Sequence, residues 1–155
     1  MGLTRTVQIV NPSGPGGELV DLNVETAGTL GAERIGAGIT GQTAGENITQ
    51  GDPVFLDAAD SKWRRSRADT AVTLPARGVA KTTVLANSTF DIITDQQAAG
   101  YTFTAPDKNK NVFIGVTGGV TLTPPSASGQ KIQRVGFVFS TTQIQVDLGE
   151  VISIP

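Results

Sequence analysis

The chain contains no cysteine and no histidine, and it has one methionine, one tryptophan and one tyrosine in 155 residues. Without cysteine, no disulfide can hold the fold together, so stability has to come from core packing, subunit contacts or both. Without histidine, the chain lacks the usual general base near neutral pH and the commonest transition-metal ligand. These absences disfavour the familiar hydrolytic and metal-dependent chemistries.

An excess of one charge and long apolar runs are missing too. Twelve basic residues against 14 acidic ones give a net charge of −2, which creates no dominant field for nucleic acid or anionic lipid. No apolar run approaches the roughly 20 residues of a membrane helix. The start, Met1–Arg5, lacks the apolar core of a signal peptide. We therefore expect no nucleic-acid partner, no membrane and synthesis inside a cell.

The apolar residues that are present favour β-structure. The chain has 15 Val, 11 Ile and 20 Thr, against nine Leu and the single Met. β-branched side chains lose rotamer freedom in a helix but pack well on a pleated sheet. Because 19 Gly and eight Pro are scattered along the chain, no helix could run far. The composition predicts an all-β fold, either a small β-barrel or a β-sandwich of short antiparallel strands.

Alternation of apolar and polar residues marks the individual strands. The clearest early case places Val20, Leu22 and Val24 on one face of a strand. Gly118-Gly119 suits a tight hairpin turn that needs positive φ. We also expect a hairpin through Ser140-Thr141-Thr142. The further strands are expected at about 34–40, 53–57, 62–67, 77–84, 89–94, 101–104, 111–117, 119–122, 131–139, 143–148 and 151–154.

The first 17 residues look different from the rest. Leu3, Val7 and Ile9 alternate loosely with polar residues over 3–10, and the stretch 11–17, Asn-Pro-Ser-Gly-Pro-Gly-Gly, reads as a turn or flexible joint. We expect an extended N-terminal arm and hinge over 1–17, followed by a β-domain over 18–155.

A weak internal repetition has an offset of 58 residues. Val-Phe-Leu at 54–56 is followed by Gly-Val at 78–79. Val-Phe-Ile at 112–114 is followed, after the same interval, by Gly-Phe at 136–137. The offset is longer than the about 20–50 residues usual in repeat arrays. A duplicated β-unit would explain the spacing, and so would chance in a chain rich in Val, Thr and Gly. The two copies would span about 45–84 and 103–142.

No catalytic or cofactor motif is present. The chain has no phosphate-binding loop, no dinucleotide fingerprint and no serine nucleophile elbow. Asp57 and Asp60 are close in sequence, as are Asp91 and Asp95. These pairs read as solvated turn and strand-end residues, because neither supplies the spaced oxygen ligands of a calcium loop. We expect no enzyme activity, no metal and no cofactor.

One basic cluster surrounds the single tryptophan, Trp63, and consists of Lys62, Arg64, Arg65 and Arg67. Such a cluster can bind nucleic acid through phosphate contacts and stacking. The acidic overall balance and the lack of a second basic patch favour a solvated or subunit-facing strand instead. Alternation puts Trp63 and Arg65 on one face and Lys62 and Arg64 on the opposite face.

Two stretches resemble β-domains of bacteriophage head decoration and head-tail fibre proteins. The first runs from Gly45 to Leu56, continues with Lys62-Trp63 and ends in the strand 74–80, Leu-Pro-Ala-Arg-Gly-Val-Ala. The second runs from Gly118-Gly119-Val-Thr-Leu-Thr-Pro-Pro to the strand around 132–136. The resemblance covers about 45–148. The sequence departs from it at 113–115, where Phe-Ile-Gly replaces the usual Tyr-Leu-Ser.

The resemblance implies a structural virion protein without an active site. We expect a decoration or cement protein that binds the outside of an assembled phage capsid, with the major capsid protein and further copies of itself, as a homotrimer, as partners. It would be found on the virion exterior, and in the host cytoplasm during assembly. The alternative is a fibre, tail or receptor-binding component, for which the short chain leaves no shaft. The residues expected to contact the capsid or another subunit are Leu3, Arg5, Val7, Ile9, Trp63 and Arg65.

Overall fold

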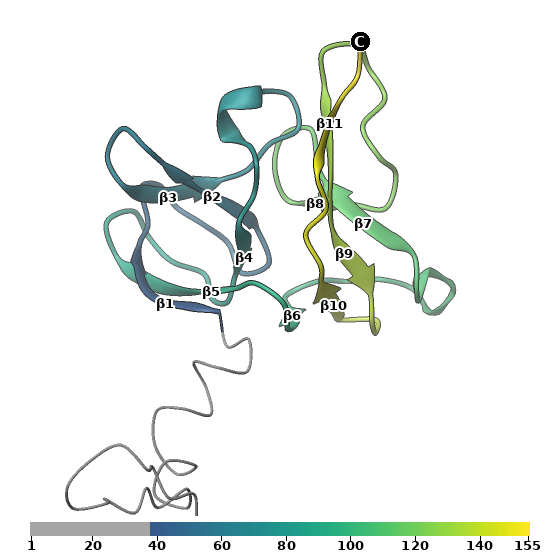
Figure 1. Ribbon diagram of the computed structural model, residues 1–155. Helices are drawn as coiled ribbons and strands as arrows, with labels where there is room; N and C mark the ends of the chain where they lie inside the picture. Colours follow the sequence, from purple (N-terminus) through teal and green to yellow (C-terminus); the bar gives the residue numbers. More distant parts are fainter. Residues whose placement is uncertain (1–37) are drawn as a thin grey trace, which may run out of the picture. The chain divides into compact units, whose positions relative to one another are not determined.

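A computed structural model of the chain describes residues 38–155, and its elements are β-strands and two short 3-10 turns (Figure 1). The expected all-β fold is confirmed. The strands are β1 (Ile39–Thr43), β2 (Pro53–Asp57), β3 (Lys62–Arg65), β4 (Gly78–Ala80), β5 (Thr89–Ile93), β6 (Gln97–Ala99), β7 (Asn111–Ile114), β8 (Val120–Thr121), β9 (Lys131–Val138), β10 (Gln143–Val146) and β11 (Val151–Ser153). The 3-10 turns are η1 (Ala71–Thr73) and η2 (Ala105–Asp107).

The strands form two antiparallel sheets. The first sheet has the order β1-β5-β4-β2-β3, and the second has the order β6-β10-β9-β7-β8, with β11 added beside β9. The second order is the first one shifted by five strands along the chain. The register repeats as well, because Val54 pairs with Gly78 in the first sheet and Val112 pairs with Gly136 in the second. The 58-residue spacing in the sequence thus has a counterpart in the strand order and pairing of the two sheets.

Both expected hairpins are present. Gly118 and Gly119 connect β7 to β8 with φ of 103° and 67°, values that residues with a Cβ rarely adopt. The Gly115 N–H donates to the Gly119 carbonyl at 3.0 Å and closes this turn. The β9–β10 hairpin closes through the Phe139 N–H and the Gln143 carbonyl at 3.0 Å.

Several expected strands differ from the structure; those expected over 62–67, 111–117 and 143–148 end early, at Arg65, Ile114 and Val146. The strand expected at 101–104 is wrong: the edge strand of the second sheet is β6, and residues 101–104 lead into η2. At Thr104 the chain turns because its side chain and that of Asp107 cap η2 reciprocally, and Pro106 then removes a ladder donor. The strand expected over 77–84 ends at Ala80. Residues 34–37 of the strand expected over 34–40 lie outside the described residues, and β1 covers its end and continues to Thr43.

The first sheet curls around its own small core. The Gly45 N–H donates to the Trp63 carbonyl at 2.7 Å, which joins the end of β1 to β3 through a parallel bridge and brings the two edges of the sheet together. Eight buried residues fill the inside: Ala44, Ile48, Val54, Trp63, Ala80, Val84, Phe90 and Ile92.

A second core joins the two sheets. Val79 and Ile93, on the outer side of the first sheet, lie in one buried cluster with residues of the second sheet such as Val112 and Ile144. Polar contacts reinforce this junction: the buried Gln133 side chain of β9 accepts from the Ala76 N–H at 2.8 Å and donates to the Ala76 carbonyl at 3.2 Å. The outer side of the first sheet therefore covers the buried face of the second sheet.

The expected arm and hinge over 1–17 lie outside the described residues, together with the beginning of the expected domain up to residue 37.

Candidate functional site

The arginines of the basic cluster pair with neighbouring carboxylates. Arg64 lies between Asp57 and Asp60, with nitrogen–oxygen distances of 2.9 and 2.7 Å. Arg65 Nε lies 2.8 Å from Asp52 Oδ2, within ion-pair distance but without the alignment of a hydrogen bond. A set of arginines paired in this way has little positive field left for a phosphate backbone.

Trp63 has a different role from the expected one. Its side chain is 4% exposed and belongs to the core inside the first sheet, and its indole N–H donates to Gln42 Oε1 at 2.9 Å. A residue buried this deeply offers almost no surface to a partner, so the expected contact role of Trp63 is replaced by a core role. Arg65, which was expected on the same face, holds Asp52 and stays about one-third exposed.

Three of the four aspartates in the two pairs form local ion pairs. Asp57 and Asp60 share Arg64, while Asp91 accepts from the Gly41 N–H at 3.1 Å and pairs with Lys81 at 3.4 Å. Within residues 38–155, no group of three or more Asp and Glu side chains is arranged to hold a metal ion.

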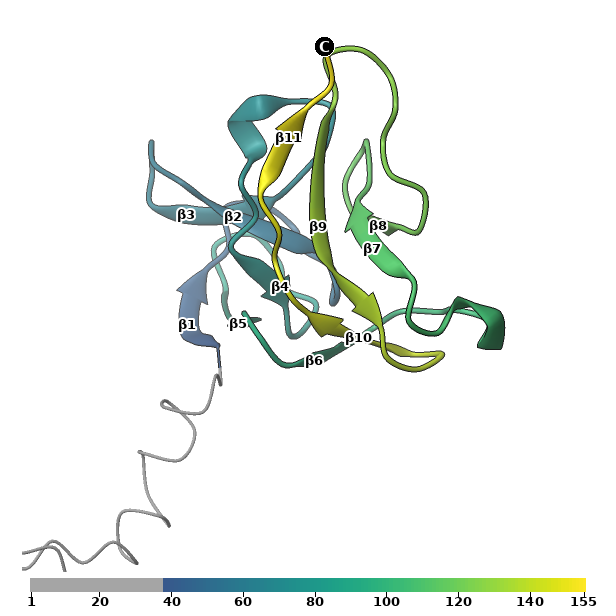
Figure 2. The ribbon, with the colours of Figure 1, turned by 45° about the vertical axis from the view of Figure 1, so that its right-hand side comes forward.

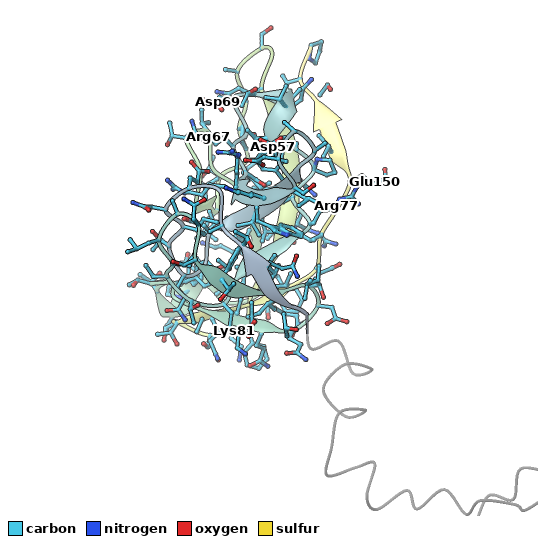
Figure 3. The ribbon with its side chains drawn as sticks, turned by 90° about the vertical axis from the view of Figure 1, so that its left-hand side faces the viewer. Asp57, Arg67, Asp69, Arg77, Lys81 and Glu150 are labelled. Atoms are coloured by element: carbon cyan, nitrogen blue, oxygen red, sulfur yellow. The ribbon has the colours of Figure 1, made fainter. Side chains whose placement is uncertain are left out.

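Charged side chains of both signs lie on the side of the molecule seen in Figure 3. Figure 3 shows them spread from Asp69 near the top to Lys81 near the bottom, with Arg77 and Glu150 on one side. A surface of interspersed signs steers no ligand of one charge. Contacts with a macromolecular partner would then depend on apolar side chains and strand edges.

A group of partly enclosed polar residues lines a hollow of about 350 Å³ between the two sheets. Asp52, 6% exposed, accepts from the Thr49 N–H at 2.9 Å, and the Tyr101 hydroxyl donates to the Gly51 carbonyl at 2.8 Å. The Tyr101 ring stacks on that of Phe103 with centroids 5.7 Å apart. Burial, and secondly the negative charge of Asp52, raise the pKa of the Tyr101 hydroxyl. The polar groups at this hollow are hydrogen-bonded to neighbouring groups of the protein. We therefore interpret the hollow as a junction between the sheets.

The raised pKa of Tyr101 predicts a loss of stability in alkali. The unfolded chain releases the tyrosine proton near pH 10, while the folded protein retains it. Stability from this group is thus complete below about pH 10 and falls as the pH rises further. We expect Tyr101→Phe to flatten the decline in the free energy of unfolding between about pH 9 and pH 11.5, measured by urea titration. Equal slopes for the two proteins would show that Tyr101 is not the responsible group.

An apolar surface lies where η1 approaches β11 (Figure 2). A hollow of about 250 Å³ there is lined by Ala71, Leu74, Pro75, Lys131, Val151 and Ser153. Val72 of η1 is 81% exposed, and Val151 of β11, which lines the hollow, is 36% exposed. We call these two exposed residues, together with the hollow, the η1–β11 surface. It combines exposed aliphatic groups with a concave site, as protein-binding surfaces do.

The outer edge of β11 is unpaired within the described chain. The Ile154 N–H donates to the Gln130 carbonyl at 3.0 Å, and Ile152 pairs with Ile132 of β9. Because bonding direction alternates along an antiparallel strand, Val151 and Ser153 turn their N–H and C=O groups away from β9. All three residues of β11 are exposed. This edge can accept a further strand.

Of the other expected contact residues, Leu3, Arg5, Val7 and Ile9 lie outside the described residues. The η1–β11 surface was missed at the sequence level, because β11 and η1 are about 80 residues apart in the chain and no motif links them.

Comparison with known proteins gives no assignment, since no family model, curated protein or solved structure matches the chain. The resemblance to phage virion β-domains therefore rests on the sequence motifs alone. No helix in the described part of the chain is long and apolar enough to span a membrane.

Proposed function

We propose that this chain is a structural protein of a phage virion that binds the outside of the assembled capsid and stabilises it, acting as a homo-oligomer, most simply a trimer. The observation that carries the proposal is the η1–β11 surface, where exposed Val72 and Val151 lie beside a hollow and an unpaired strand edge. The phage assignment itself comes from the motifs at 45–80 and 118–136.

A cement protein needs a rigid body and a surface that adheres to another protein. Two cores and a junction held by buried Gln133 supply the body. The η1–β11 surface supplies two modes of contact: aliphatic side chains that lose water on binding, and main-chain groups that can extend the sheet into a partner.

The N-terminal arm adds a second attachment in this proposal. Residues 3–10 would bind as a β-strand to a sheet edge of the capsid protein or of a neighbouring copy, with Leu3, Val7 and Ile9 as anchors. The residues 11–17 would act as the hinge that lets the arm reach its partner.

Binding to capsids that lack this protein tests the proposal. We expect Val72→Asp combined with Val151→Asp to weaken binding about 100-fold or more, because two charges would have to be buried at the contact. Co-sedimentation of purified capsids with increasing protein measures this change. The matched control is Leu85→Asp, which charges a 68% exposed leucine in the loop between β4 and β5 and should change binding less than about threefold.

The same assay separates the surface from the arm. Deleting residues 1–10 should reduce binding and leave the melting temperature of the body unchanged if the arm is an attachment device. Unaltered binding by both the truncated protein and the doubly charged variant would refute capsid attachment through these two elements.

A further inference from the structure

The outer face of the second sheet carries half of the phenylalanines in the chain. Phe137 and Phe139 are two residues apart on β9 and its continuation, so their side chains lie on the same face. Val112, Val135 and Val138 point to the opposite face, into the core that joins the sheets. Phe113 follows Val112 and therefore also points outward. We call Phe113, Phe137 and Phe139 the phenylalanine face.

These rings are incompletely covered. Phe139 is 42% exposed, and Phe113 and Phe137 are partly exposed, whereas Phe90 inside the first sheet is 4% exposed. Leaving aromatic surface of this extent in water forgoes a large part of its hydrophobic stabilisation. Aromatic residues are also enriched in the cores of protein–protein interfaces. The phenylalanine face is therefore a candidate interface.

The equivalent face of the first sheet is more deeply buried than the phenylalanine face. At the 58-residue offset, Phe55 corresponds to Phe113 and Val79 corresponds to Phe137. Phe55 is 9% exposed and Val79 is fully buried, and Val79 packs into the core shared with the second sheet. On the first sheet, this face is thus covered by another sheet of the same chain. On the second sheet, no described segment covers it to the same degree.

The charges around the phenylalanine face suit contact with an identical face. The cross-strand neighbours of Phe137 are Asn111 and Gln145, and both are uncharged. Arg134, beside Phe113, is paired with Asp147 at 2.7 Å. Where copies meet around a symmetry axis, each group near the axis faces its own copy, so an unpaired charge would be repelled. Here the polar surroundings are neutral or already paired.

We infer that the phenylalanine face is the surface through which copies of this chain associate. The inference rests on the homo-oligomer of the proposed function and names the interface that forms it. The occupants of the face are the same faces of the neighbouring copies, and the Phe113, Phe137 and Phe139 rings of all copies meet around the symmetry axis and form the buried centre. The η1–β11 surface, made by different elements, stays free for the capsid.

The test is the mass of the full-length protein in solution. At about 50 μM we expect a mass that is a multiple of the 16.0 kDa chain, measured by sedimentation equilibrium. Phe137→Ser combined with Phe139→Ser should raise the dissociation constant at least about 100-fold and give the monomer, since loss of two central aromatics removes most of an interface's affinity. Leu85→Ser, the matched control, should keep the wild-type mass.

A second measurement covers the case in which the double variant fails to fold. Because the chain has no cysteine, Gln143→Cys places a single thiol opposite Phe139 on the neighbouring strand. We expect this thiol to react with a disulfide reagent at least about tenfold more slowly in the concentrated protein than after dilution to monomer. Leu85→Cys should react at one rate at both concentrations.

A wild-type monomer at about 50 μM, an oligomer that survives the serine substitutions, or a Gln143→Cys thiol without protection would overturn the inference. None of these assays contains capsids. A protein that binds capsids as a monomer would therefore contradict this inference and the proposed homo-oligomer, and would leave capsid binding standing. An oligomer that does not bind capsids would contradict capsid binding and leave the inference standing.

Discussion

Replacing Gly136 with alanine is expected to destabilise the protein by about 3 kcal/mol and lower its melting temperature by roughly 6–12 °C. A Cβ built at Gly136 would lie 1.9 Å from the Gln145 carbonyl oxygen on the neighbouring strand. This atom belongs to the backbone of β10, so the strands themselves would have to separate. Differential scanning calorimetry measures the shift.

Gly78 provides a graded comparison, because it occupies the equivalent place in the first sheet. A Cβ there would lie 2.3 Å from Ile92 Cγ2, a side-chain atom that can rotate, and 2.7 Å from the Ile93 carbonyl oxygen. Gly78→Ala should therefore destabilise somewhat less than Gly136→Ala. Gly129→Ala is the control: it has open space and φ of +82°, so it reports the backbone cost alone, about 1 kcal/mol. Equal losses at all three positions would contradict the close approach of the strands.

Replacing Gln133 with leucine is expected to cost about 3–5 kcal/mol. The substitution keeps the volume but removes the hydrogen bonds to the Ala76 N–H at 2.8 Å, to the Ala76 carbonyl at 3.2 Å and to the Gly149 carbonyl at 3.1 Å. Ala76 is 2% exposed, so its backbone groups have little access to replacement water. Such a loss is a large share of the 5–15 kcal/mol typical of a domain.

The matched control for Gln133 is Gln130→Leu, because Gln130 bonds to the Ala127 N–H in an exposed turn. It should change the free energy of unfolding by about 0.5 kcal/mol or less in urea titrations. If the two leucine variants unfold alike, Gln133 does not hold the sheets together.

Alternation in the sequence was sufficient to place most strands. Ile144 and Val146 alternate with glutamines and both are fully or nearly fully buried in β10. At 101–104, Tyr101 and Phe103 alternate with threonines, but these residues do not form a strand. Their rings pack against the core, but a capped 3-10 turn and Pro106 end any ladder. Local alternation reports which side chains face inward, and strand pairing needs the partner as well.

The functional surfaces were less predictable because they depend on contacts between distant residues. Trp63 in a run of cations resembles a surface residue, yet closure of β1 onto β3 buries it. Gln133 reads as an ordinary polar strand residue, and its buried role depends on Ala76, 57 residues away. The repetition at 58 residues was visible in the sequence, but the equal strand order of the sheets was not, because loops of unequal length obscure the alignment of β5 with β10.

Electron microscopy of purified virions tests the central claim most directly. The account predicts density for the two-sheet body on the outside of the capsid, with the η1–β11 surface against the shell and neighbouring copies in contact through their phenylalanine faces. Density for this body only in a tail or a fibre, or its absence from purified particles, would contradict the account.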